Sequence, residues 1–139
     1  MSDVEKMTVK AQEAMQAAAK MAESKGNSAV EPEHLLSQLV TQSDGFVPGL
    51  ITQAGGQLPG VKRDLEVALA RLPQVTGSAK RVVASQRLVQ LFNRAEVEAR
   101  ALGDEYISTE HFLLAVLSEG AAPDIAKLFK NNGLTRNKV

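Results

Sequence analysis

The chain has 139 residues, of which 44% are hydrophobic, and its 16 basic and 16 acidic side chains cancel. This length supports one domain, or two half-size lobes that share an interface, without disulfides. Because cysteine is absent, disulfides, thiolate metal sites and cysteine nucleophiles are excluded. The balanced charge, without a basic block, predicts no nucleic-acid partner. Neither a bilayer-spanning apolar run nor a signal peptide is found, so we expect a cytoplasmic protein without a membrane partner.

The first predicted helix begins after Thr8, a good N-cap residue, and ends at Gly26. Its small and apolar residues recur at helical spacing, as Met7, Ala11, Ala14, Ala18, Met21 and Ala22. The small side chains allow another helix to approach closely, as a compact bundle requires. We therefore expect one face of this helix to be buried.

Three further helices are predicted before residue 74. The second begins at Pro32, because proline suits the first position of a helix. A short third helix ends at Gly55, and a fourth spans residues 61–72 and is stopped by Pro73. The second and third helices are expected to bury Leu35, Leu36, Leu39, Val40, Val47, Leu50 and Ile51.

The same pattern returns 77 residues later. Residues 26–36 read GNSAVEPEHLL and residues 103–113 read GDEYISTEHFL, so that His34 and His111 are in register. Such an echo indicates a duplicated unit whose copies bury their apolar faces against each other. The sequence therefore predicts an all-α fold of two pseudo-symmetric four-helix repeats. Repeat one spans about residues 8–72 and repeat two about residues 85–139, with a linker at residues 73–84.

Repeat two has the expected counterparts of the first three helices. Ser108 is predicted to be an N-cap, and Gly133 is predicted to end the helix that matches the short third one. The expected buried residues are Phe112, Leu113, Val116, Leu117, Ile125, Leu128 and Phe129. A fourth helix has no complete counterpart, since LTRNKV begins like a helix capped by Thr135 and then the sequence ends. We therefore expect a fragment of a longer protein with its last helix truncated.

No constellation of residues indicates chemistry by this chain. The phosphate-loop motif is missing, and the two Glu-His pairs lack the spacing of a zinc helix, so we expect neither a catalytic nor a metal site. Each histidine is the third residue of its predicted helix and is expected to organise the helix start. Glu33 and Glu110 fall in the first turn, where a carboxylate meets the positive end of the helix dipole.

Several motifs occur in an order typical of one known family. They are TVKAQEAMQAAAKMA, VEPEHLLSQL, ARLPQVTGS, GDEYIS and ISTEHFLLAVL. From Thr8 onward the chain resembles the double Clp N-terminal domain of the Clp ATPases, and its RLPQVTG link is similar to that of the ClpB-type protein disaggregases. The resemblance implies a mobile helical domain above a homohexameric AAA+ ring, where ATP and magnesium bind. The isolated domain is then expected to be monomeric, without a cofactor or catalysis.

The resemblance also implies that the domain binds unfolded or aggregated polypeptides, or adaptor proteins. Thr8, Asp104 and Glu110 match positions that the family associates with substrate handling, and Glu33 is the repeat-one counterpart of Glu110. Arg94, Glu98 and His111 stand where some relatives carry apolar groove residues, which implies a more polar groove. Leu88, Leu91, Phe92 and Val97 could supply exposed apolar surface at the seam between the repeats, although burial in the core is the expected fate of any single one of them.

Three alternatives remain open. The domain could instead serve a protease-associated Clp ATPase, in which paired glutamates recognise phosphorylated arginine, since a carboxylate can bind a guanidinium in bidentate fashion. Thr8, Asp104 and the two glutamates could also be purely structural, as an N-cap, an Asx-type turn and helix-dipole partners. A stand-alone enzyme that uses the Glu-His pairs is the third possibility.

Overall fold

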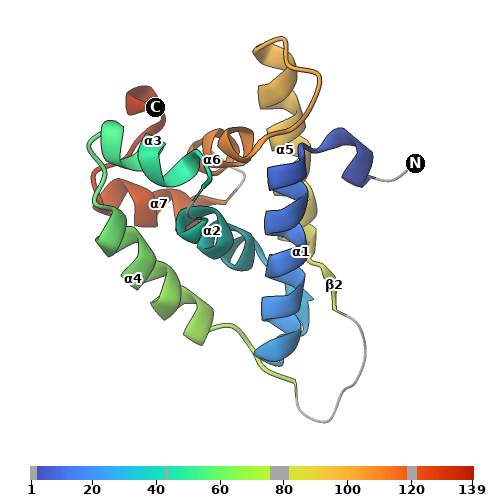
Figure 1. Cartoon of the computed structure of the whole chain (residues 1–139). Coiled ribbons are helices and arrows are strands. Elements are labelled where there is room, and N and C mark those ends of the chain that lie inside the picture. The colour runs from blue at the N-terminus through green and yellow to red at the C-terminus, as the bar shows by residue number, and fades with distance from the viewer. Residues whose placement is uncertain (1–2, 43, 76–81, 119–121) are drawn as a thin grey trace.

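A computed structural model describes residues 3–42, 44–75, 82–118 and 122–139 (Figure 1). The helices and strands, in chain order, are η1 (Asp3–Lys6), α1 (Val9–Ser24), β1 (Ala29–Val30), α2 (Pro32–Thr41), α3 (Val47–Gln53), α4 (Leu58–Ala70), β2 (Val83–Ala84), α5 (Gln86–Ala101), α6 (Thr109–Leu117), α7 (Pro123–Asn131) and η2 (Arg136–Lys138). The predicted all-α fold is confirmed. Over the described ranges, no helix is both long and apolar enough to cross a bilayer.

The helices repeat with the register that the sequence predicts. α1 and α5 are both 16 residues long, and each end of α5 lies 77 positions after the same end of α1. α2 and α6 also begin 77 positions apart, at Pro32 and Thr109. The turns that precede them contain Gly26 and Gly103, with φ angles of 72° and 76° that favour glycine.

The two short central helices, α2 and α6, are buried along most of their length. α2 packs against α1 and α4, and α6 packs against α5 and α7, so that both central helices are covered (Figure 1). The alanine face of α1 is fully buried, which lets α2 approach closely, as the sequence predicts. Met21, expected on the same face, is only half-buried at its edge. Contacts of α3 with α6 and of α4 with α7 join the repeats.

The two repeats also exchange backbone hydrogen bonds around the starts of their long helices. Val30 of β1 pairs in parallel with Ala84 of β2, and Ile107 pairs in parallel with Met7. The Ser85 N–H donates to the Val30 carbonyl at 3.0 Å, and the Thr8 N–H donates to the Ile107 carbonyl at 2.9 Å. Val30 and Ile107 are equivalent positions at the offset of 77, and so are Met7 and Ala84, so the exchange is reciprocal.

The fourth helix and the C-terminus differ in detail from the sequence prediction. α4 begins at Leu58 rather than at residue 61, because Pro59 needs no amide partner in a first turn and the Gln57 N–H is bonded to the Asn132 carbonyl at 2.8 Å. After Thr135 the chain forms the 3-10 turn η2, in which Thr135 makes no side-chain cap bond.

The proposed linker is described only at its ends. Asn27 donates to the Pro73 carbonyl at 3.0 Å, and the Val75 N–H donates to the Gly26 carbonyl at 2.7 Å, so residues 73–75 are fastened to the turn before α2. The middle of the predicted linker, residues 76–81, lies outside the described residues.

Candidate functional site

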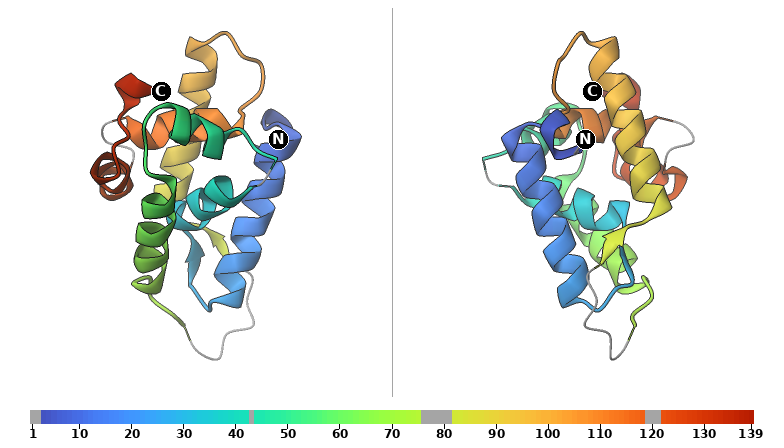
Figure 2. Two further views of the ribbon diagram at one scale, coloured as in Figure 1. Left: turned by 60° about the vertical axis from the view of Figure 1, so that its left-hand side comes forward. Right: turned by 90° about the vertical axis from the view of Figure 1, so that its right-hand side faces the viewer.

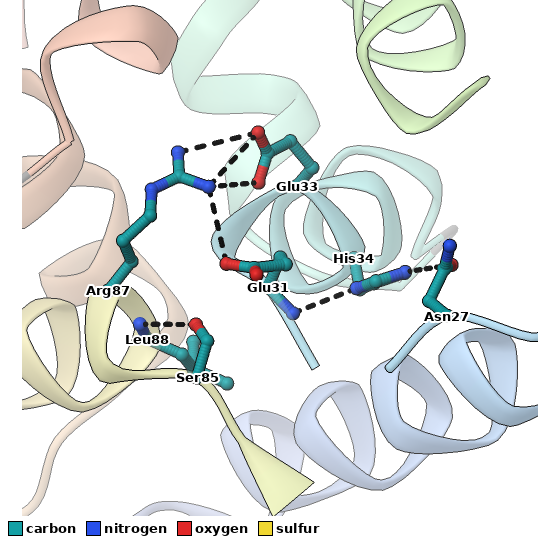
Figure 3. A network of polar contacts seen from close by, with 7 residues as sticks. All are labelled: Asn27, Glu31, Glu33, His34, Ser85, Arg87 and Leu88. Carbon is teal, nitrogen blue, oxygen red and sulfur yellow. Dashed lines mark hydrogen bonds and ion pairs between the residues drawn. The ribbon is translucent and has the colours of Figure 1, made fainter. Parts of the chain in front are cut away.

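The two histidines organise the starts of the central helices. The Glu31 N–H donates to His34 Nδ1 and the Ser108 N–H donates to His111 Nδ1, both at 2.8 Å. Since each Nδ1 is an acceptor, Nε2 of a neutral ring carries the proton and donates to the residue seven positions earlier. That acceptor is Asn27 Oδ1 for His34, at 2.8 Å (Figure 3).

For His111 the acceptor is the carboxylate of Asp104, also at 2.8 Å. Asp104 therefore supports the histidine of α6, instead of the Asx-type turn that the sequence suggested. The offset of 77 residues places Asn27 and Asp104 at equivalent positions. This equivalence was the feature of the sequence from which the contact could have been predicted. Burial lowers the pKa of His34, whose side chain is fully enclosed.

Glu33 is already bound within the molecule. It is 6% exposed, and both of its carboxylate oxygens lie within 3.4 Å of the Arg87 guanidinium, which also contacts Glu31 at 3.2 Å (Figure 3). Arg87 comes from the first turn of α5, so this cluster joins the helix starts of the two repeats. Sequence analysis missed it, since nothing in the local pattern around Arg87 points to a partner 54 residues away.

Four of the six candidate residues come together in one cleft. Thr8, Asp104, Glu110 and His111 line a hollow of about 300 Å³ between the start of α1 and the turn before α6. The remaining lining residues are Glu105, Tyr106 and Ser108. We call this the Thr8–Glu110 cleft. Its lining contains three carboxylates and a tyrosine that is 54% exposed.

The free groups in this cleft can accept and donate hydrogen bonds. Thr8 Oγ1 accepts from the Ala11 N–H at 3.2 Å, as an N-cap does, and its hydroxyl proton stays available. Glu110 is half-buried in the first turn of α6, and no hydrogen bond or ion pair to it occurs among the described residues. The cleft therefore suits a ligand that presents N–H donors or a cation.

Arg94 lies elsewhere, in an ion-pair cluster around Glu98. The Glu98 carboxylate is 3% exposed and accepts bonds of 2.6 and 2.9 Å from Arg136 and of 3.2 Å from Arg94. The hydrogen bond from Arg136 is the main cause that lowers the pKa of Glu98. Arg94 also lines a second groove, beside α7, and does not reach the Thr8–Glu110 cleft.

The apolar seam proposed from the sequence is not formed. Leu88, Leu91 and Phe92 are buried because their face of α5 packs against α6, where the rings of Phe92 and Phe112 lie 6.2 Å apart. Only Val97, at 48% exposure, remains at the surface. Among the residues that the structure describes, no three His, Cys, Asp or Glu side chains are grouped as a metal site would require.

Comparisons with known proteins agree with this architecture. The model of the Clp repeat (R) N-terminal domain matches residues 6–132. Chaperone protein ClpB of Bdellovibrio bacteriovorus is 46% identical over 129 residues, which are 93% of this chain and 15% of that protein. The chain thus spans about 15% of the length of this relative.

Two solved structures show the same fold at low sequence identity. The Hsp104 N-terminal domain from Candida albicans has a TM-score of 0.82 and 21% identity, covering 95% of this chain and 85% of that one. A complex of the ClpV N-domain with a VipB peptide has a TM-score of 0.79 and 23% identity, covering 97% and 82%. Because the family model covers both helical repeats, the chain belongs to the Clp repeat N-terminal domain family.

Proposed function

We propose that this domain is the substrate- or adaptor-docking domain of an ATP-dependent ClpB-type chaperone, and that it recognises unfolded or aggregated polypeptides without catalysis of its own. The single observation that carries the proposal is the Thr8–Glu110 cleft. Its open carboxylate, free hydroxyl proton and exposed Tyr106 ring can meet backbone N–H groups, basic side chains and apolar side chains of a disordered segment.

Two similarities support this proposal. The relative with 46% identity is named as the chaperone ClpB, and the ClpV N-domain has been solved with a bound peptide on the same fold. In such a chaperone, ATP and magnesium binding and homohexamer assembly belong to regions outside this chain. The domain itself acts as a monomeric binding module, and six weak copies on a ring would gain avidity by about 10² or more.

Titration of the isotope-labelled chain with permanently unfolded casein tests the proposal. Amide shifts are expected at the residues of the Thr8–Glu110 cleft, and Glu110→Gln is expected to reduce them. Glu66→Gln, at an exposed position of α4, removes the same charge away from the cleft and serves as the matched control. Shifts that are absent, or that are confined to the core, contradict the proposal.

A second candidate is the degron-binding domain of a protease-associated Clp ATPase. One observation favours it: Glu33 holds a guanidinium, that of Arg87, and Glu110 has the same helix position in repeat two without a partner among the described residues. A peptide that contains phosphorylated arginine should then bind the Glu110 cleft more tightly than its unmodified form. Equal binding of the two peptides would rule this candidate out.

A further inference from the structure

A second groove lies on repeat two, away from the Thr8–Glu110 cleft. It has a volume of about 830 Å³ and runs between α5, the end of α6, α7 and the C-terminal residues, which lie together at one side of the molecule (Figure 2). Its apolar lining consists of Leu117, Ala126 and Leu134, and its amide and hydroxyl groups come from Ser118, Asn131, Thr135 and Asn137.

The charged side chains among the described lining residues of this groove have one sign. Its described lining residues include Arg94, Lys127, Lys130 and Arg136, and no acidic residue. Arg94 and Arg136 share the single carboxylate of Glu98, which leaves one positive charge in excess. Lys127 and Lys130 are exposed and have no ion-pair partner within the described part of the chain, so they add two more.

The repeat provides an internal control for this charge. The third helices of the two repeats are α3 and α7. In these helices Ile51 and Phe129 occupy equivalent positions, at an offset of 78 residues, and both are fully buried. With that offset Lys127 and Lys130 correspond to Gly49 and Thr52, and with the offset of 77 Arg94 corresponds to Ala17. Repeat one forms the same helices without these cations, so the fold of a repeat does not require them.

We propose that this groove docks acidic segments of client polypeptides that also carry aliphatic side chains. Charge complementarity carries the proposal: the three positive charges in excess attract carboxylates, while Ala126 and the edge of Leu117 offer a small aliphatic surface to side chains such as leucine. The inference rests on the proposed function, since it specifies which client segments the domain takes. Nucleic acid fits less well, because no aromatic side chain on which a base could stack occurs in the described lining.

The test is a titration of the chain with a fluorescent peptide in which glutamate pairs alternate with leucine. Amide shifts are expected at Leu117, Lys127, Lys130 and Leu134, and added salt should weaken binding. The variant Lys127→Glu/Lys130→Glu should bind this peptide about tenfold more weakly, since each exposed ion pair changes a binding constant only severalfold. Lys62→Glu/Arg63→Glu on α4 makes the same change of charge at exposed positions outside the groove and should bind normally.

Three results would overturn the inference. They are equal binding of the peptide with lysine in place of glutamate, equal loss of binding in the control variant, and tighter binding of a single-stranded DNA oligonucleotide at the same residues. Unfolded casein is titrated in parallel to separate the two proposals. If casein shifts the Thr8–Glu110 cleft while the acidic peptide fails, only the groove inference is wrong; if neither ligand binds, both proposals are wrong.

Discussion

The Arg87 guanidinium lies 3.2 Å from the Glu33 carboxylate, although the two residues are 54 positions apart and belong to different repeats. Glu33 is buried at the first turn of α2, whereas Arg87 is partly open to solvent. Repeat two therefore supplies the cation that neutralises a carboxylate buried in repeat one. As long as Arg87 stays in place, Glu33 is not free to meet a ligand.

Removal of Arg87 and removal of Glu33 should lower the free energy of unfolding by different amounts. Arg87→Met leaves the enclosed Glu33 carboxylate without its cation and should lower the free energy of unfolding by about 1–3 kcal/mol. Glu33→Gln should lower the free energy of unfolding by less, because the Arg87 guanidinium keeps its ion pair with Glu31 and its contact with solvent. Urea unfolding measures both changes.

The matched control for this pair is Arg100→Met, whose guanidinium is 71% exposed and 3.7 Å from Glu96. It should change the free energy of unfolding by no more than about 0.5 kcal/mol. If Arg87→Met cost no more than this control, the Arg87–Glu33 contact would have no part in stability.

Glu98 should fasten the C-terminal turn to α5. Glu98→Gln removes the charge that Arg136 and Arg94 share, and should cost about 1–2 kcal/mol of unfolding free energy. It should also speed amide hydrogen exchange at Lys138 and Val139, whose N–H groups are bonded within this turn. Glu66→Gln is the control, and unchanged exchange in Glu98→Gln would show that the turn is held by other contacts.

The same carboxylate predicts acid sensitivity in a defined range. Because the pKa of Glu98 is lower in the folded chain than its ordinary value of 4.5, its stabilisation is complete above pH 4.5 and is lost as the pH falls through the folded value. In Glu98→Gln this part of the acid destabilisation should vanish. Unfolding free energies of both proteins, measured below pH 5, provide the comparison.

His34 should affect the stability of the fold at higher pH than Glu98 does. Burial lowers its folded pKa below the ordinary value of 6.5, so the unfolded chain takes up the proton first, and stability falls as the pH drops below 6.5 toward the folded pKa. Asn27→Asp would give His34 a carboxylate partner like that of His111, raise its pKa and flatten this slope.

The slope with pH is the decisive measurement for Asn27→Asp. The substitution also removes the hydrogen bond from Asn27 to the Pro73 carbonyl and should cost about 1 kcal/mol at neutral pH. Asn93→Asp, at an exposed position of α5, introduces the same charge elsewhere and should leave the slope unchanged. An identical slope in Asn27→Asp and the parent chain would exclude His34 as its source.

Thr8 should have a structural role that can be separated from binding. Thr8→Ala and Ser85→Ala remove equivalent N-caps, with bonds of 3.2 and 3.0 Å, and should each cost about 1 kcal/mol of unfolding free energy. Thr8→Ser keeps a hydroxyl and should recover most of that loss. If Thr8→Ser were as unstable as Thr8→Ala, the hydroxyl would not be the source of stability.

Most helix starts and ends could be predicted because their causes are local. Thr8 caps α1, Gly26 and Gly103 take positive φ angles after α1 and α5, and the two histidines bond to the backbone three residues earlier. Each of these depends on residues within a few positions of one another. Repetition at an offset of 77 residues then extended these assignments from one half of the chain to the other.

The ion pairs between distant residues could not be predicted, because they depend on how the helices pack. Glu98 and Arg136 are 38 residues apart, and their contact exists only since the C-terminal turn lies against α5. The same packing buries Leu88, Leu91 and Phe92, which the sequence left as candidates for exposed surface. Periodicity identifies an apolar face but does not show whether a neighbour covers it.

The reciprocal backbone bonds bear on how the molecule can come apart. Thr8 and Ser85, the cap residues of the long helices, each give their own N–H to a carbonyl of the opposite half. Each repeat thus donates one of these hydrogen bonds and accepts the other, as the two subunits of a twofold-symmetric dimer do, although here both repeats belong to one polypeptide. Either repeat on its own would lose main-chain hydrogen-bond partners. The two repeats should therefore unfold together in one cooperative transition.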